Sequence, residues 1–494
     1  MEGLLQFRRL KHSIQQVGQD TGDDLQKQIS TKENDGGKRI VDFDVDDPNN
    51  PCNWSLLYKL LCTCLVWNLV FVTGWASAAG SAAHEVTAKD FHVSKIAESL
   101  STAMYLFGVG TGALLAGPIS ETIGRLFTYL STSMFYLIWI MASALAPNFA
   151  AQIVFKLLAG LFSAASMSIY GGTLADMFEP NERAVVWPFF ALSPLLGPTI
   201  APIASGWIVD CMGWRWVDWV TLIISGAAFL AAVAFLPETF SPIILSFKAS
   251  LVRKETGDQS YKSEHDEEAN LLTRLKDNLS MIVYFIFRET TTLLFGIYIT
   301  LLYMLIFGFL EGFNYIFTQT YHFDVGYRFT SFGAIGVGIL LGLPYVVLLN
   351  HFSSPGPKVP PPEKRLKPAV FASVLLPISL FWIGWTNRPD ISYWSDLGAC
   401  CLFGFALMAL FTSTYHYILD AYGTNAASAL AAITFMRYFA SGGMVLATEP
   451  LYKVLTVKWM LTLLGCVAAV LTPVPWIFSW KGTSMRRRSK WAEA

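Results

Sequence analysis

Three charged side chains stand inside long apolar runs of this sequence: Lys156, Glu311 and Arg437. A charge at the centre of a hydrocarbon layer costs at least about 2.5–3.5 kcal/mol on insertion scales, so each should face the interior of the protein. Partial burial disfavours the charged form of a carboxyl group, so Glu311 could take up and release protons. Apart from tyrosines, Glu311 is the only ionisable residue from Thr290 to Thr318, and the sequence therefore predicts no neutralising group nearby.

Two alternatives stay open for these charges. Lys156 could respond to protonation of a carboxylate such as Glu311, or Glu311 could form an ion pair with Lys156 or Arg437 that only holds the structure together. Arg437 could be structural, bound to helix carbonyls or to a fixed carboxylate. We treat all three as candidates for proton coupling or for the wall of a central cavity.

Aromatic side chains on the same runs could line a cavity for flat, apolar ligands, although each could equally be packing. The candidates are Trp67, Tyr170, Tyr298, Tyr303, Phe307 and Tyr315. No nucleophile and base stand at catalytic spacing, and the seven cysteines have no spacing typical of a disulfide framework or a metal site. We therefore expect neither an enzyme nor a cofactor or metal site.

Two polar turns carry further charges. The turn GPISETIGR has glycines that permit tight geometry and a glutamate and an arginine four residues apart, and the turn DMFEPNERA could supply partners for them. The residues are either a solvated helix–turn–helix or a latch whose ion pairs favour one conformation. The candidates for this latch are Gly117, Glu121, Gly124, Arg125, Asp176 and Arg183.

The stretch SPLLGPTIAPIASGW places helix-breaking residues inside an apolar run. Such residues are tolerated in a membrane where neighbouring helices or a cavity satisfy the backbone again. A bend at a moving interface and plain close packing are both compatible with the pattern. The residues concerned are Gly197, Pro198, Pro202 and Gly206.

The elements that carry these residues are long apolar segments. The chain has 494 residues, of which 53% are hydrophobic and only 14% charged, which is typical of a membrane protein. About 20 apolar residues span the hydrocarbon core as a helix. Twelve spans are predicted, at about 58–80, 96–116, 126–145, 149–173, 184–209, 214–236, 290–318, 329–350, 369–386, 393–418, 425–448 and 457–480.

Small residues at every fourth position, such as Gly160, Ala164, Ser168 and Gly172, let neighbouring helices approach closely. The stretches GVGTGALLAGP and GVGILLGLP, in the second and eighth spans, suggest a parallel repeat of six spans. The predicted fold is an all-α polytopic membrane protein with two six-helix halves. Its parts are a disordered cytosolic tail (1–56), a first half (57–237), a cytosolic linker (238–288), a second half (289–480) and a basic tail (481–494).

Basic residues set the orientation. Most of the 35 lysines and arginines fall on the side that holds both termini, which predicts cytosolic termini. The terminal RRRSK would anchor the chain on the cytosolic leaflet. The formal net charge of −1 suggests no nucleic-acid partner.

Taken together, these motifs resemble the major facilitator superfamily, and specifically its twelve-span fungal drug:proton antiporters. The resemblance covers nearly the whole chain from Asp47 onward. Beside the two motifs in GPISETIGR and SPLLGPTIAPIASGWI, it rests on DPNNPCNWS, LPETFSPIIL, YILDAYGTNAASALAAITFMR and the terminal MRRRSK.

The resemblance implies the major facilitator fold and export of small, largely apolar organic compounds by proton antiport through alternating access. It also implies a plasma-membrane protein that works as a monomer in the bilayer, with substrate and protons as its partners. Lys156 stands where the family usually has an arginine implicated in proton coupling, Leu126 replaces a frequent second basic residue, and Asn314 replaces a common proline. Uptake or facilitated diffusion of a small solute, and a transport-dead sensor on the same scaffold, are the alternatives.

Overall fold

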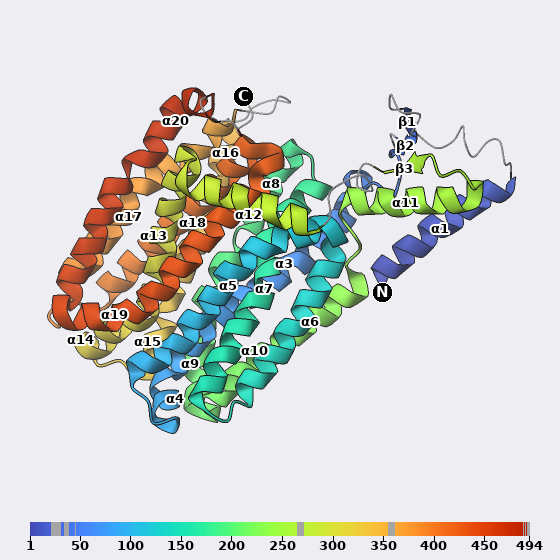
Figure 1. Ribbon diagram of the computed structural model, residues 1–494. Coiled ribbons are helices and arrows are strands. Elements are labelled where there is room, and N and C mark those ends of the chain that lie inside the picture. Colours follow the sequence, from blue (N-terminus) through green and yellow to red (C-terminus); the bar gives the residue numbers. More distant parts are fainter. Residues whose placement is uncertain are drawn as a thin grey trace.

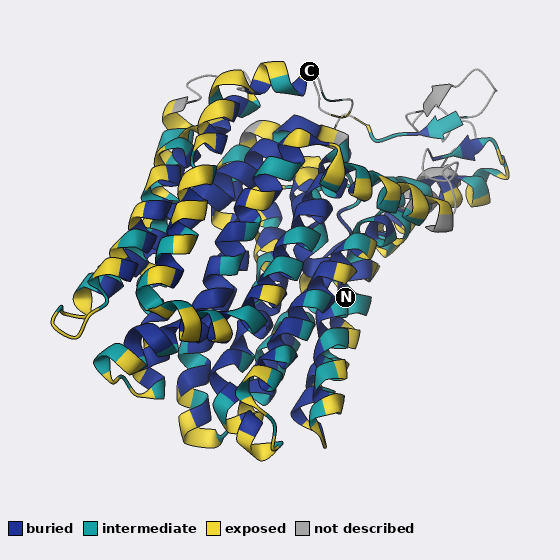
Figure 2. Cartoon of the chain, turned by 60° about the vertical axis from the view of Figure 1, so that its left-hand side comes forward, coloured by how far each residue is buried: buried dark blue, intermediate teal, exposed yellow. Residues whose placement is uncertain are grey.

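The computed structural model describes residues 1–20, 31–33, 39–44, 46–263, 271–353, 361–487, 489 and 491. Its main body is a bundle of long helices, and a smaller unit of helices and short strands projects from one side of it (Figure 1). Buried residues lie along the inner faces of the helices, and the exposed residues lie mostly on the outside and at the ends (Figure 2).

The first half of the bundle runs from α3 to α10. Its helices are α3 (Leu56–Ala79), α4 (His84–Asp90), α5 (Lys95–Ile123), α6 (Arg125–Ala144), α7 (Phe149–Met177), α8 (Pro180–Phe190), α9 (Ser193–Met212) and α10 (Arg215–Phe235), with short 3₁₀ turns η1 (Pro51–Asn53) and η2 (Gly80–Ala83).

The second half runs from α13 to α20. It consists of α13 (Thr290–Phe313), a π-helical turn η4 (Asn314–Thr318), α14 (Gln319–Tyr321), α15 (Val325–Thr330), α16 (Phe332–Ser353), α17 (Lys367–Thr386), α18 (Trp394–Tyr422), α19 (Ala426–Leu471) and α20 (Pro473–Arg486), with 3₁₀ turns η5 (Pro362–Leu366) and η6 (Gly423–Asn425). The halves are joined through α11 (Ser241–Thr256) and α12 (Leu271–Phe287).

The predicted count of twelve spans is close to what the described residues show. Eleven helical segments are long and apolar enough to cross a membrane, and the last of them, Ala426–Arg486, has 61 residues. At about 1.5 Å per residue this segment is roughly three times as long as a hydrocarbon core is thick. The backbone of Thr456 is non-helical, with φ 61°, and divides the segment into two crossings.

Glycines set the closest helix crossings in both halves. A Cβ added to Gly160 on α7 would lie 2.1 Å from the carbonyl oxygen of Tyr105 on α5. A Cβ on Gly404 of α18 would lie 2.1 Å from the carbonyl oxygen of Ile335 on α16. Since only glycine fits at either crossing, the two halves use the same device, and it involves the helices that carry the predicted repeat.

The C-terminus lies on the same side of the bundle as the polar turns around Arg125 and Asp176, and we call this side the motif end. The other side, which holds α4, α14 and α15, is the distal end (Figure 1). At the motif end α12 lies across both halves and packs against α5 and α19. Ser428 on α19 donates a 2.8 Å hydrogen bond to the side-chain oxygen of Asn278 on α12. The segment predicted as a linker is thus partly helical and in contact with the bundle.

The prediction of a disordered tail is wrong for several described residues before α3. They form α1 (Glu2–Asp20), β1 (Thr31–Glu33) and β2 (Arg39–Val41), and β2 pairs with β1 and with β3 (Tyr261–Lys262). Leu10 on α1 is buried in a small apolar cluster with Val41, Val252 and Tyr261. The polar tail folds because α11 and β3 supply an apolar surface that the tail lacks by itself.

The basic C-terminal tail also differs from the prediction. Helix α20 extends to Arg486, whose guanidinium is buried and lies 2.9 Å from a carboxylate oxygen of Glu363. A lipid headgroup therefore cannot be the partner of Arg486 in this conformation. The remaining basic residues of the stretch include Arg488 and Lys490, which lie outside the described residues.

Candidate functional site

The predicted latch at the motif end is built around Arg125. Its Nε donates to Asp176 Oδ2 at 3.0 Å, and one terminal nitrogen donates to Ser120 Oγ at 2.6 Å. A Cβ on Gly172 of α7 would lie 2.7 Å from the guanidinium, so glycine leaves room for it there. The sequence left two possible partners for Arg125, Glu121 or a neighbouring helix, and the acceptor Asp176 comes from the neighbouring helix α7. Gly117 and Glu121 lie in the preceding turn of α5.

Glu238 completes this turn, and sequence reasoning missed its role, although the motif LPETFSPIIL contains it. Its carboxylate accepts hydrogen bonds from the backbone N–H groups of Arg125 and Leu126, at 3.0 and 3.1 Å, and so caps the N-terminus of α6 from a distant segment. Gly124 has φ 96°, and a Cβ there would lie 2.6 Å from a Glu238 oxygen. Burial raises the pKa of Glu238 above its ordinary value, although backbone donors oppose this effect.

A second ion-pair set at the motif end joins the two halves. Arg183 on α8 lies 3.3 Å from one carboxylate oxygen of Asp420 on α18, and Arg365 lies 3.2 Å from the other. Arg183 belongs to the first half and Asp420 to the second, so this contact joins the two halves at the motif end. A cleft of about 620 Å³ at this end is lined by Arg125 and Arg183, and also by Ser168, Leu419 and Leu430.

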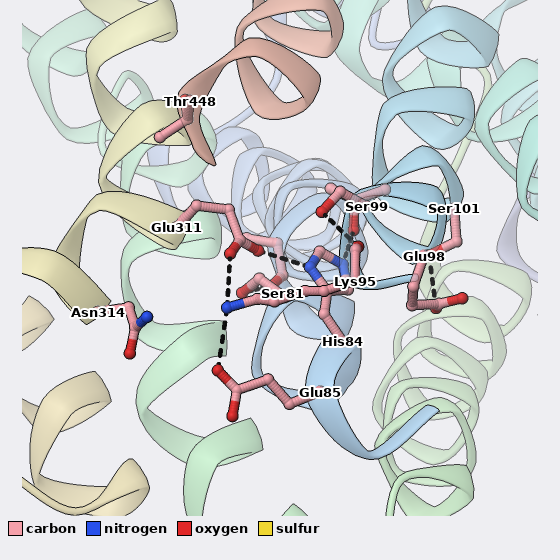
Figure 3. A network of polar contacts seen from close by, with 12 residues as sticks. Ser81, His84, Glu85, Lys95, Glu98, Ser99, Ser101, Glu311, Asn314 and Thr448 are labelled. Carbon is pink, nitrogen blue, oxygen red and sulfur yellow. Dashed lines mark hydrogen bonds and ion pairs between the residues drawn. The ribbon is translucent and has the colours of Figure 1, made fainter. Parts of the chain in front are cut away.

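Glu311 lies at the distal end and is not isolated, contrary to the expectation from its span. Only 3% of the residue is exposed, and its Oε1 lies 2.6 Å from His84 Nδ1 (Figure 3). Its Oε2 lies 3.4 Å from Lys95 Nζ. His84 and Lys95 come from α4 and α5 of the first half, so Glu311 joins the two halves. The alternative pairings with Lys156 and Arg437 are wrong.

The network around Glu311 continues through further charged groups. Lys95 also donates to Glu85 at 2.9 Å, and Arg328 on α15 lies 3.7 Å from the same carboxylate. Arg328 donates to Asn314 at 2.7 Å, at the start of the π-helical turn η4. His84, Glu85 and Lys95 fall in a loop of the predicted topology, and no periodicity marks them, because only the folding back of α4 brings them to Glu311.

Lys156 has a different carboxylate partner. Its Nζ lies 2.5 Å from Asp218 Oδ1 on α10, and Ser143 donates to Asp218 Oδ2 at 2.8 Å. All of this lies within the first half. Sequence reasoning missed Asp218, although its position as an acidic residue near the start of the predicted sixth span could have identified it. Lys156 and Glu311 therefore belong to separate ion pairs. In the described part of the chain, no three His, Cys, Asp or Glu side chains gather as possible metal ligands.

Arg437 lies in the centre of the bundle and is fully buried. Neither a carboxylate nor a helix carbonyl binds it, since Nε and both terminal nitrogens have no hydrogen-bond partner among the described residues. Four aromatic rings surround the guanidinium carbon, with centroids 4.4–5.6 Å away. We call these rings the aromatic cage: Tyr303, Phe411, Tyr415 and Tyr438.

The predicted cavity-lining aromatics divide into three groups. Tyr303 belongs to the cage, Phe307 packs against Tyr303, and Tyr170 stacks on Trp187 at 5.8 Å. Trp67 stacks on Phe71 and donates to the carbonyl oxygen of Phe189 on α8 at 3.3 Å, and Tyr315 stacks on Tyr452 in a small cluster apart from the main core. Trp67 and Tyr315 therefore do not join the central site, and Tyr298 is buried in the main core.

The glycines and prolines of the predicted bend lie within one helix, α9. A Cβ on Gly197 would lie 2.7 Å from the carbonyl oxygen of Phe71, which fixes the crossing of α9 with α3. A Cβ on Gly206 would lie 3.1 Å from Phe329 Cβ, where α9 meets the second half. Pro198 and Pro202 are buried between these contacts. The packing interpretation of this motif accounts for both glycines.

Comparison with known proteins places the chain among transporters. The sequence model described as Major Facilitator Superfamily matches residues 65–445. The MFS-type transporter kojT of Aspergillus flavus is 41% identical over 91% of this chain and 82% of the relative. The citrinin biosynthesis cluster MFS transporter mrr1 of Monascus ruber is 33% identical over 92% of both chains.

Solved structures share the fold at low sequence identity. The proton:xylose symporter XylE superimposes with a TM-score of 0.64 and 13% identity, over 86% of this chain and 97% of that one. The human organic anion transporter MFSD10 superimposes with a TM-score of 0.60 and 15% identity, over 85% of this chain and 100% of that one. The predicted all-helical fold with two halves is thereby confirmed.

Proposed function

The chain belongs to the Major Facilitator Superfamily, and from this premise we propose that it exports small, largely apolar organic compounds in exchange for protons. It is an integral, multi-pass membrane protein, and its family and fungal relatives make it a transporter of small molecules. The finer parts of the proposal are the direction, the proton coupling and the substrate class. We further propose that it works as a monomer in the plasma membrane with both termini in the cytosol.

The observation that carries the proposal is the ion-pair bridge across the two halves at Glu311. Together with the Arg183–Asp420 contact at the motif end, it means that charged pairs join the halves at both ends of the bundle. Alternating access requires that one set breaks while the other holds. A proton that reaches Glu311 would remove its negative charge and with it the attraction to His84 and Lys95. Protonation would therefore open the distal end.

The position of Glu311 at the distal end implies the direction in which the proton crosses the membrane. In the proposed orientation the distal end faces the outside, where protons are more abundant. Loading of Glu311 from that side would accompany release of the substrate, and return of the proton to the cytosol would restore the bridge. The substrate and the proton would then move in opposite directions through one bundle.

The test is accumulation in inside-out membrane vesicles with and without an imposed pH gradient. Three labelled probes with the same ring system are used: 2-naphthoate, 2-naphthamide and 2-naphthylmethylammonium. Vesicles without the protein correct for passive partition of the weak acid and the weak base. We expect gradient-dependent accumulation of at least one probe in vesicles that contain the wild-type protein.

Glu311→Gln keeps the shape of the side chain but cannot carry a proton. We expect this variant to reach the membrane and to move the probe without dependence on the pH gradient. Asp90→Asn is the matched control, because it removes an exposed carboxylate at the same end, where Asp90 pairs with Arg215 within the first half. Wild-type gradient dependence in Glu311→Gln would refute the role of Glu311. Transport by the wild-type protein that never depends on a gradient would favour a facilitative transporter, and binding without any transport would favour a sensor.

A further inference from the structure

Arg437 is a buried cation whose hydrogen-bonding groups are unused. A guanidinium carries five N–H donors in a planar fork, and in Arg437 none of its three nitrogens meets an acceptor among the described residues. The side chain is fully buried, so bulk water does not solvate it. An unpaired buried charge is costly, and proteins retain one where it serves a function.

The acidic residues of the bundle interior do not compensate this charge. Each of the buried carboxylates of the spans that could have done so has partners of its own elsewhere. Among the described residues, these partners are Lys156 for Asp218, His84 and Lys95 for Glu311, Ser101 and Gln152 for Glu98, Arg125 for Asp176, the Asn387 and Thr386 side chains for Asp396, Lys453 for Glu449 and Arg486 for Glu363. A positive charge is thus left at the centre of the protein.

The aromatic cage covers the guanidinium and reaches the other half of the bundle. Tyr415 of the cage stacks on Trp187 at 6.5 Å, and Trp187 stacks on Tyr170. Trp187 and Tyr170 belong to α8 and α7 of the first half, whereas Arg437 and the cage belong to the second. The hydroxyl of Tyr170 is buried and has no hydrogen-bond partner among the described residues. A ligand between the halves would therefore meet flat rings on both sides.

We propose that Arg437 binds the acidic group of the transported substrate, and that this substrate is a planar aromatic anion such as a carboxylate or an enolate. The proposal rests on the proposed function, because it takes the ligand at this site to be the exported compound. A planar guanidinium matches two oxygens of a carboxylate with two parallel hydrogen bonds. The rings would stack on the body of the ligand, and the positive charge of Arg437 would repel a cationic ligand.

The cleft at the motif end gives such a ligand a route. Leu430 lines that cleft and lies seven residues before Arg437 on α19, which is roughly 10 Å along the helix. Leu419 also lines it and lies four residues after Tyr415 on α18, or about 6 Å. The rings of the aromatic cage surround the guanidinium. Movement of these rings would admit the ligand from the cleft, on the side that we propose to be cytosolic.

The experiment measures binding to the purified full-length protein in detergent, with no pH gradient. Tritiated 2-naphthoate and 2-naphthamide have the same ring and nearly the same shape, and only the naphthoate is charged at pH 7. We expect the wild-type protein to bind the anion about tenfold or more tightly, because charge-assisted hydrogen bonds are the stronger ones. Equal affinity for the two probes in the wild-type protein would overturn the proposal.

Variants assign the preference to Arg437. We expect Arg437→Gln to bind both probes with affinities within about twofold of each other, and Arg437→Lys to keep part of the preference, since it keeps the charge and loses the fork. Arg215→Gln is the control, because it removes an exposed arginine at the distal end. A tenfold preference that survives in Arg437→Gln would also overturn the proposal. If Arg437→Gln does not fold, the affinities of the wild-type protein for the two probes, together with those of Arg437→Lys, still test the proposal.

The two proposals fail in different measurements. Anion-selective binding without gradient-dependent accumulation would refute proton-coupled export and leave the anion site standing. Gradient-dependent accumulation of the amide or the ammonium probe, without preference for the anion in binding, would refute the anion site and leave export standing.

Discussion

The Lys156–Asp218 pair permits a test that separates a structural role from a role in proton coupling. The two atoms lie 2.5 Å apart, and each side chain is no more than 8% exposed. Lys156→Ala leaves Asp218 buried, with the Ser143 hydroxyl as its remaining side-chain hydrogen-bond donor among the described residues. Removal of one partner of a buried ion pair typically costs about 3–5 kcal/mol, whereas replacement of both partners by neutral groups is often close to neutral.

The expected stabilities follow from these values. For a half of this size, a loss of about 3–5 kcal/mol lowers the melting temperature by roughly 10 °C. We expect this decrease in Lys156→Ala and recovery of most of it in the double variant Lys156→Met with Asp218→Asn. Thermal unfolding in detergent, followed by size-exclusion chromatography of the remaining monodisperse protein, measures both. Lys156→Arg should retain the pair and the activity.

Transport then decides the function of the pair. If Lys156 takes part in coupling, the double variant is stable but its transport no longer depends on the pH gradient. Wild-type gradient dependence in the double variant would remove Lys156 from the mechanism and leave it a structural residue. A melting temperature of Lys156→Ala equal to that of the wild-type protein would refute the energetic reasoning itself.

Two further predictions concern the motif end. Glu238→Ala leaves the N–H groups at the start of α6 without their acceptor. We expect the free energy of unfolding to fall by roughly 2–4 kcal/mol, and the same thermal assay measures this loss. An unchanged melting temperature would show that water replaces the carboxylate of Glu238 as the cap. Asp47 is buried, which raises its pKa, but hydrogen bonds from Asn49 and Lys248 outweigh this effect and leave the pKa below its ordinary 3.8. The stabilisation by Asp47 is therefore fully present above about pH 4 and is lost as the pH falls through the lower folded value. We expect the difference in melting temperature between the wild-type protein and Asp47→Asn to be constant from pH 7 to about 4 and to shrink below; a difference that grows in acid would contradict this sign.

The sequence by itself was enough for the class of fold. Long apolar runs with few charges leave the backbone no alternative to helices in a bilayer, since each N–H and C=O must be satisfied within its own segment. The order of the motifs also identified the family. The stripe of small residues also marked one of the tightest crossings, because a Cβ at Gly160 would collide with a carbonyl oxygen of α5. The cost of an unpaired charge drew attention to Lys156, Glu311 and Arg437.

The sequence could not supply the partners of these charges. Asp218 lies 62 residues from Lys156, and His84 lies 227 residues from Glu311. Such pairs are made by the packing of one helix against another and by the folding back of a loop, and neither leaves a periodic trace in the chain. Local reasoning therefore found no neutralising group near Glu311 in its span and could offer only Lys156 or Arg437 as partners. For Arg437 it offered helix carbonyls or a carboxylate. Only the tertiary structure put two basic groups beside the acid and left the arginine among aromatic rings, because long-range packing alone decides which charges meet.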